Sequence, residues 1–285
     1  MMSRPLVLRS EYGRLGNQIF QYAALRSLGG TLILSGFSDL ASTFSNVGAR
    51  IAPKYLTRLI DRLSFPGGRA QRMISPVVGL IVEDDANGRL VYAPGKAFYL
   101  CNRDVFFQRE SPAILEQALN LSFRPEVTRR AEQFLQGINV HERDFFAIHV
   151  RGGDFSVFPS TEHPAQLPLG WILRQVDRLR EIRGDSPLIV VGDDPGLKNE
   201  IAWQTGASQS RERPSVDLAL MAMSSGGVVS NSTFAWWGSA FAAHRSPMKP
   251  RFLAPEYWLG HRLQTWSPPD IRQSSHLEFM PVTLD

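Results

Sequence analysis

The chain has 285 residues, of which 43% are hydrophobic and 20% charged, and its formal net charge is +4. This profile indicates a globular protein of one or two domains and excludes a long disordered chain. A single cysteine, Cys101, excludes an internal disulfide and a cysteine-cluster metal site, and the absence of a basic block or known motif argues against nucleic-acid binding. No apolar stretch has the length of a membrane span, so we expect a cytoplasmic protein, or one peripheral to the inner membrane.

The N-terminal part of the chain opens with an α/β pattern. PLVLRS (5–10) predicts a strand, EYGRLGNQ (11–18) a glycine-punctuated loop, IFQYAALRSLGG (19–30) a helix, and TLILSG (31–36) a second strand. This order of strand, loop, helix and strand is typical of an α/β architecture.

The middle of the chain is less regular. Residues 37–110 are predicted to be loop-rich with at most short strands, apart from a helix over 54–63. A helical stretch over 112–136 follows, with Ser111 as its N-cap and Pro125 interrupting the run. GINVHERD then predicts a link, which divides the chain into domains at 1–139 and 140–285.

The C-terminal part predicts a parallel sheet. Buried strands are expected at 145–150, 187–192 and 226–232, and helices at 169–182, 215–225 and 233–244. Strands joined through helices form a parallel sheet with right-handed crossovers.

Polar side chains follow all three of these strands. They form the clusters His149/Arg151/Asp154, Asp193/Asp194 and Ser230/Asn231/Ser232/Thr233. The carboxyl ends of parallel strands meet at one edge, where open α/β sheets bind their ligands. The sequence therefore predicts a binding site at this edge.

The segment HVRGGD has the chemistry to bind a phosphorylated ligand. The planar fork of Arg151 can pair with two phosphate oxygens, His149 can hydrogen-bond a base or a phosphate, and Asp154 can act as a base or orient one. An alternative interpretation is purely structural: His149 satisfies a backbone carbonyl, and Arg151 pairs with Asp154 at the strand end.

The segment SNSTFAWWG predicts an anion site at a helix start. Ser232 and Thr233 fall where a strand gives way to a helix, so hydroxyls and free N–H groups converge at the positive end of the helix dipole. Simple N-capping is the alternative. Trp236 is either core packing or an apolar wall for a sugar.

Three further features are more ambiguous. Asp217 at a helix start complements the dipole or accepts the two donors of guanine. Asp193 and Asp194 precede Pro195 and have no third acid nearby in the sequence, so we predict no metal site. The loop GRLGNQ matches no standard phosphate-binding motif, yet Gly13 and Gly16 allow backbone amides to approach an anion.

Three motifs together resemble a known family. GRLGNQIFQYAAL, HVRGGD and SNSTFAWWGSAF, in this order from about residue 12 to about residue 245, are similar to the bacterial α-1,2-fucosyltransferases of glycosyltransferase family 11. The resemblance implies a GT-B-like fold of two Rossmann-like α/β domains, with the acceptor on the side of 1–139 and GDP-β-L-fucose held by 140–285. It also implies inverting, metal-independent transfer of fucose to the 2-hydroxyl of a galactose-type acceptor in a glycan, such as a surface-polysaccharide repeat, without a cofactor.

The resemblance also assigns roles to residues. Arg151 and Asp154 are the expected catalytic residues, with Glu162 and Glu11 as fallback bases, and His149 and Asp217 are expected to recognise guanine. The expected donor-binding residues are Gly13, Arg14, Gly16, Asn17, His149, Arg151, Asp193, Asp217, Asn231, Ser232 and Thr233.

One position departs from the family pattern. The pattern is HxRRxD, and the second arginine is here Gly152. Loss of one charged partner of a phosphate costs about 1.5–3 kcal/mol. This leaves two alternatives open beside a fucosyltransferase: a non-catalytic relative that binds a GDP-sugar or a glycan, and a transferase of the same fold with another donor sugar.

Overall fold

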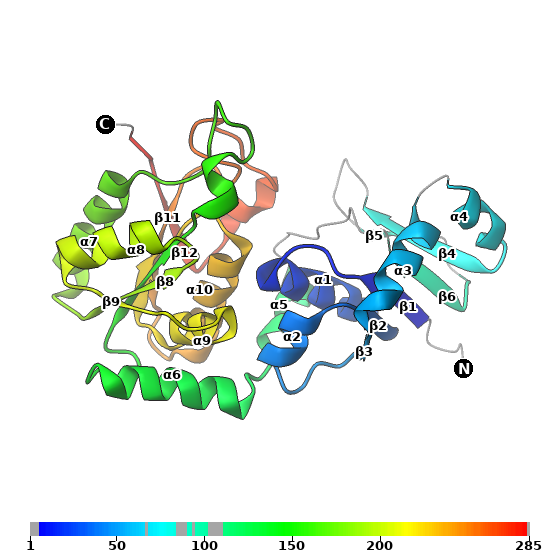
Figure 1. Ribbon diagram of the computed structural model, residues 1–285, viewed down its shortest axis with the longest axis horizontal. Helices are drawn as coiled ribbons and strands as arrows, with labels where there is room; N and C mark the ends of the chain where they lie inside the picture. Colours follow the sequence, from blue (N-terminus) through cyan, green and yellow to red (C-terminus); the bar gives the residue numbers. More distant parts are fainter. Residues whose placement is uncertain (1–5, 66–67, 84–89, 93–94, 102–110, 284–285) are drawn as a thin grey trace. The chain divides into compact units, whose positions relative to one another are not determined.

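The computed structural model describes residues 6–65, 68–83, 90–92, 95–101 and 111–283 (Figure 1). The chain divides into two compact units, Met1–Arg124 and Pro125–Asp285. The division falls earlier than the boundary expected at 139/140, because helix α6 (Pro125–Gly137) packs on helix α9 (Pro214–Met223) of the second unit.

The first unit is built on a six-stranded sheet with the order β3-β2-β1-β6-β4-β5, in which only the β4–β5 pair is antiparallel. Its strands are β1 Leu6–Ser10, β2 Thr31–Ser35, β3 Arg50–Ala52, β4 Val78–Glu83, β5 Leu90–Val91 and β6 Phe98–Cys101. Its helices are α1 Leu15–Ser27, α2 Ser38–Thr43, α3 Thr57–Ser64, α4 Arg69–Ile74 and α5 Pro112–Leu119, with a 3₁₀ turn at Lys54–Leu56.

The prediction for residues 37–110 allows short strands, and β6 is one of them, but the local pattern does not reveal its place in the sheet. Strand β6 lies in the middle of the sheet beside β1, and Tyr99, Leu100 and Cys101 are buried. A central strand of four residues is too short to show a period of its own, so only its pairing partners identify it. The interruption at Pro125 is confirmed, because α5 ends at Leu119 and Pro125 opens α6. Ser111 caps α5 by accepting the N–H of Ile114 at 3.2 Å.

The second unit holds a six-stranded, all-parallel sheet with the order β12-β11-β10-β7-β8-β9. Its strands are β7 Phe146–Val150, β8 Leu188–Gly192, β9 Ser208–Gln209, β10 Gly226–Val228, β11 Arg251–Pro255 and β12 Leu277–Met280. Its other helices are α7 Leu169–Arg183, α8 Pro195–Thr205 and α10 Thr233–Arg245, with 3₁₀ turns at Gly153–Ser156 and Pro269–Gln273. Counted from β7, this is the order 3-2-1-4-5-6 of a dinucleotide-binding sheet, and the strand order reverses between β7 and β10.

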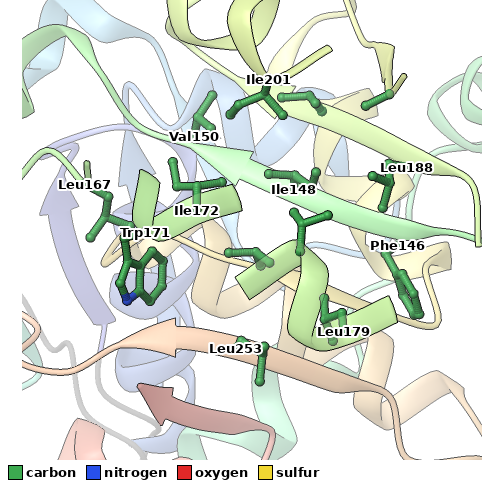
Figure 2. Packing of buried hydrophobic residues seen from close by; sticks show 14 of the residues in the cluster. Phe146, Ile148, Val150, Leu167, Trp171, Ile172, Leu179, Leu188, Ile201 and Leu253 are labelled. Atoms are coloured by element: carbon green, nitrogen blue, oxygen red, sulfur yellow. The ribbon is translucent and has the colours of Figure 1, made fainter. Parts of the chain in front are cut away.

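Alternation along β7 decides which side chains reach the site. Phe146, Ile148 and Val150 pack with apolar side chains of α7, including Trp171, on one face of the sheet (Figure 2). His149 lies one position out of phase with these residues and therefore points to the opposite face. There its ring lies 5.4 Å from that of Phe234 on α10, measured between centroids.

Candidate functional site

A hydrogen bond joins the two strands between which the strand order reverses. His149 is the last residue but one of β7, Ser230 follows β10, and Nδ1 of His149 lies 2.8 Å from the hydroxyl oxygen of Ser230. Both side chains are buried. The alternative interpretation, in which His149 satisfies a backbone carbonyl, did not include this hydroxyl partner, which follows the neighbouring strand.

His149 is neutral at physiological pH. Burial lowers its pKa to about 3, although the carboxylate of Asp193 opposes this shift. A neutral imidazole has one nitrogen that donates and one that accepts, so if Nδ1 accepts from Ser230 the other nitrogen donates, and if Nδ1 donates the other accepts.

Arg151 is held by two carboxylates. Its Nη1 donates to Asp193 at 2.6 Å and its Nη2 to Asp154 at 2.7 Å, and its guanidinium lies 5.1 Å from the ring centre of Phe155. The expected strand-end pair of Arg151 and Asp154 is thus present. Among the residues that the structure describes, the buried Nε of Arg151 has no hydrogen-bond partner. The guanidinium group therefore still has an N–H that can donate a hydrogen bond.

Gly152 is surrounded by the acidic pair that follows β8. Its N–H donates to Asp193 at 3.0 Å, and a Cβ added to it would lie 2.1 Å from Oδ2 of Asp194. Asp194 is itself fixed, because it caps α8 through the N–H of Leu197 at 3.0 Å and accepts from the amide of Gln166 at 3.3 Å. The side chain of Asp194 thus takes the space that a second arginine would need at position 152.

The segment SNSTFAWWG forms the start of α10, as the sequence predicts. Ser232 caps the helix by accepting the N–H of Phe234 at 3.3 Å, and Thr233 is the first helical residue. Asn231 donates to the carbonyl of Trp258 at 3.1 Å, while its Oδ1 is buried and has no partner within the described part of the chain. The N-terminus of α10, which is the positive end of its helix dipole, thus adjoins Ser230 and, through Phe234, the ring of His149.

Asp217 lies at the start of α9 and supports the end of β8. Its Oδ1 accepts the Ser210 hydroxyl, and its Oδ2 accepts the N–H of Gly192 at 3.4 Å. Burial raises its pKa to about 6, against the opposing hydrogen bond from Ser210 and the charge of Lys198. Sequence reasoning missed Ser210 because β9 has only two residues and gave no strand signal.

Trp236 does not form a wall for a sugar in this structure. The side chain is 0% exposed, its Nε1 donates to Ser274 at 2.8 Å, and its ring packs edge-on against Trp237. The other interpretation, core packing, is the correct one.

The glycine loop belongs to the first unit. Gly13 and Arg14 are exposed, Gly16 is buried and Asn17 is half-buried, where β1 passes into α1. Gly13 adopts φ +76°, and a Cβ there would lie 2.3 Å from the Asn17 amide, so a side chain is excluded.

The two fallback bases come from different units. Glu11 belongs to the first unit and pairs with Lys54 at 2.6 Å. Glu162 is exposed in the loop before α7. Within the described ranges, no three His, Cys, Asp or Glu side chains are grouped to hold a metal ion.

The sequence matches the family model described as Glycosyl transferase family 11 over residues 96–248, more than half of the chain. The chain belongs to glycosyl transferase family 11. The matched segment includes every predicted site residue of the second unit, and the predictions of the family and of a glycosyltransferase are confirmed.

A mouse relative, galactoside 2-alpha-L-fucosyltransferase Sec1, is 26% identical over 85% of this chain, and the match spans 66% of the relative's length. Two solved structures share the fold at 12% identity. POFUT1 in complex with GDP-fucose has a TM-score of 0.55 over 88% of this chain and 98% of its own. The α-1,6-fucosyltransferase NodZ, soaked with GDP-fucose, has a TM-score of 0.53 over 84% and 92%. The prediction of a GT-B-like fold with two Rossmann-like α/β domains is confirmed.

Proposed function

We propose that this family 11 member transfers L-fucose from GDP-β-L-fucose to the 2-hydroxyl of a galactose-type acceptor, with inversion at the anomeric carbon. The observation that carries the proposal is the meeting of polar groups from β7, β8 and β10 where the strand order reverses, inside the segment that matches the family. The names of the curated relative and the donor bound to the solved neighbours support the choice of sugar and linkage.

The donor's diphosphate is proposed to bind at the N-terminus of α10. Ser232 and Thr233 contribute hydroxyls, the first turn contributes N–H groups, and Arg151 contributes its remaining donors. Asp154, Asp193 and Asp194 together carry more charge than the guanidinium of Arg151, so neutralisation of the diphosphate needs these helix N–H groups as well. The glycine loop with Gly13, Arg14, Gly16 and Asn17 is proposed to add to this binding.

Guanine recognition is proposed for His149 and Asp217. His149 has a neutral ring with one nitrogen bonded to Ser230. Asp217 already accepts from Ser210 and Gly192, so guanine would compete for oxygens that shape the end of β8. Asn231, with a buried oxygen lacking a partner among the described residues, and Asp193 are proposed to complete the donor site.

The proposed reaction is one displacement. The acceptor oxygen forms a bond to C1 of fucose, the bond from C1 to the β-phosphate oxygen breaks, and GDP leaves with that electron pair. The hydroxyl proton passes to the carboxylate of Asp154, or to Glu162 or Glu11 as alternative bases. Arg151 stabilises the charge that grows on the departing phosphate. A cytoplasmic location, or one at the inner membrane, and an acceptor on the side of 1–139 belong to the same proposal.

Calorimetry and a transfer assay test this function. In EDTA we expect GDP to bind more tightly than UDP or ADP, and fucose to appear on a 2-hydroxyl when GDP-fucose is supplied with a galactoside panel. Arg151→Ala should abolish both signals, while Arg129→Gln, at an exposed arginine of α6, should change neither.

The outcomes separate the three candidate functions. GDP binding without transfer or donor hydrolysis would support a non-catalytic binding protein. Transfer from another GDP-sugar in preference to GDP-fucose would support a different donor. No GDP binding at all would contradict the proposed donor site.

A further inference from the structure

Helix α3 of the first unit presents a mixed basic and apolar face to solvent. Arg58, Leu59 and Arg62 share one side of the helix by their spacing, Phe65 directly follows the helix as its C-cap, and all four are exposed. Ile60 and Ser64 on the opposite side are buried. Leu59 is 54% exposed and Phe65 60%, although burial elsewhere would stabilise such side chains.

Helix α4 extends this face. It packs beside α3 (Figure 1), and Arg69, Arg72 and Met73 are exposed on it at the same helical spacing. Met73 is 82% exposed. We call the side chains of Arg58, Leu59, Arg62, Phe65, Arg69, Arg72 and Met73 the α3–α4 surface.

The net charge of this part of the chain is strongly positive. Residues 54–77 contain five Lys and Arg residues and one acid, Asp61, so this short stretch carries as much net positive charge as the whole chain. Asp61 accepts a hydrogen bond from Ser10, and Lys54 is paired with Glu11. The four arginines that remain all belong to the α3–α4 surface.

A hollow of about 410 Å³ lies between the two helices. It is lined by Asp61, Arg62, Phe65, Gly68, Arg69 and Ala70. Two guanidinium groups beside an aromatic ring suit a phosphodiester attached to hydrocarbon, since the cations pair with the phosphate and the ring packs on the chain. The carboxylate of Asp61 opposes an anion here, and its bond with Ser10 partly satisfies it.

We propose that the α3–α4 surface binds the surface of a membrane that contains anionic lipids. Cations interspersed with exposed Leu, Phe and Met side chains are the pattern of helices that lie in a bilayer interface, where the arginines meet head groups and the apolar side chains enter the acyl boundary. A protein partner would be expected to meet a larger apolar patch with fewer charges at its centre. None of the helices in the described part of the chain combines the length and hydropathy needed to cross a bilayer.

Co-sedimentation with vesicles tests the proposal independently of any transferase activity. The full chain should bind vesicles of 70% phosphatidylcholine and 30% phosphatidylglycerol and not pure phosphatidylcholine, and 0.5 M NaCl should release it. Arg58→Gln/Arg62→Gln should weaken partitioning about thirty-fold, since each basic residue near such a surface contributes about a factor of five. Phe65→Ser/Met73→Ser should weaken it at both salt concentrations.

Matched variants on the second unit serve as controls. Trp203→Ser removes an apolar side chain that is 81% exposed on α8, and Arg129→Gln/Arg174→Gln removes two arginines outside the α3–α4 surface. Both should bind vesicles as the wild type does. Equal binding of all variants, equal binding to both kinds of vesicle, or self-association by way of Phe65 and Met73 in sedimentation velocity without vesicle binding would each overturn the proposal.

Discussion

The carboxylate of Asp194 lies in the space that a side chain at Gly152 would enter. A Cβ at position 152 would be 2.1 Å from Oδ2 and 2.6 Å from Cβ of Asp194. Rotation of Asp194 away would remove the cap from α8 and the contact with Gln166. A side chain at position 152 and the present rotamer of Asp194 therefore compete for the same space in this structure.

This competition predicts the effect of filling position 152. Gly152→Ala should lower the free energy of unfolding by about 1–3 kcal/mol, as overpacking does. Urea denaturation measures this loss. Gly196→Ala is the matched control, because its Cβ would lie at an ordinary 3.4 Å from the same carboxylate, and it should be nearly neutral.

The double variant Gly152→Ala/Asp194→Gly makes the test specific. Asp194→Gly alone should destabilise by only a few tenths of a kcal/mol through loss of the cap, because glycine is itself tolerated at this position of a helix. When Asp194 is already glycine, the change of Gly152 to alanine should lower the free energy of unfolding much less than it does in the wild type. Strict additivity of the two losses would show that the residues do not compete for space.

The edge of the second sheet was predictable because its strands are long enough to show a pattern. FAIHV and LIVVG are buried runs followed directly by polar residues, so the sequence placed His149, Arg151 and Asp193 on one edge. Their partners were not predictable in the same way. The bond between His149 and Ser230 depends on β10 lying next to β7, and strand order cannot be read from local spacing.

Trp236 shows the opposite difficulty. An aromatic side chain just after a predicted anion site fits a sugar wall and a buried core equally well. The contact with Trp237 and the hydrogen bond to Ser274, which is 38 residues away in the sequence, decide for the buried core. The same limit applies to β6, whose central place depends on its pairing with β1.

A buried Trp236 leads to a second prediction. Trp236→Phe removes the hydrogen bond to Ser274 and part of a packed ring, so it should lower the free energy of unfolding by about 2–4 kcal/mol. GDP affinity of the folded variant should stay within about twofold of wild type. Trp203→Phe, on the exposed side of α8, should leave stability unchanged. Loss of acceptor affinity without loss of stability would restore the sugar-wall interpretation.

His149 gives stability a pH dependence of known sign. Burial lowers its pKa to about 3 in the folded protein, while in the unfolded chain it titrates near 6.5. The unfolded chain therefore takes up a proton as the pH falls below about 6.5, and the folded protein does not. The stability that neutral His149 contributes is present above that pH and is lost as the pH falls toward 3.

His149→Phe should remove this dependence. The substitution should lower the free energy of unfolding at both pH values, and urea titrations should show a loss at pH 5 that is about 2 kcal/mol smaller than the loss at pH 7.5. Ser230→Ala is the control, because it removes the same hydrogen bond but keeps the imidazole, and its effect should differ little between the two pH values. A His149→Phe effect that is equal at both pH values would contradict a neutral His149.

Asp154 and Asp193 both bind Arg151, yet the proposed reaction gives them different roles. Asp193 also accepts the N–H of Gly152, so Asp193→Asn should loosen the donor site and weaken GDP binding about tenfold. Asp154→Asn removes the proposed proton acceptor, so it should lower kcat at least about a hundred-fold while GDP affinity changes little. Asp177→Asn, at an exposed position of α7, is the control for both. Calorimetry and steady-state kinetics together separate the two effects.

If Asp154→Asn keeps more than about a tenth of kcat, Asp154 is not the base. The fucosyl bond would then ionise with the help of Arg151 and the helix N-terminus alone, or Glu162 or Glu11 would take the proton.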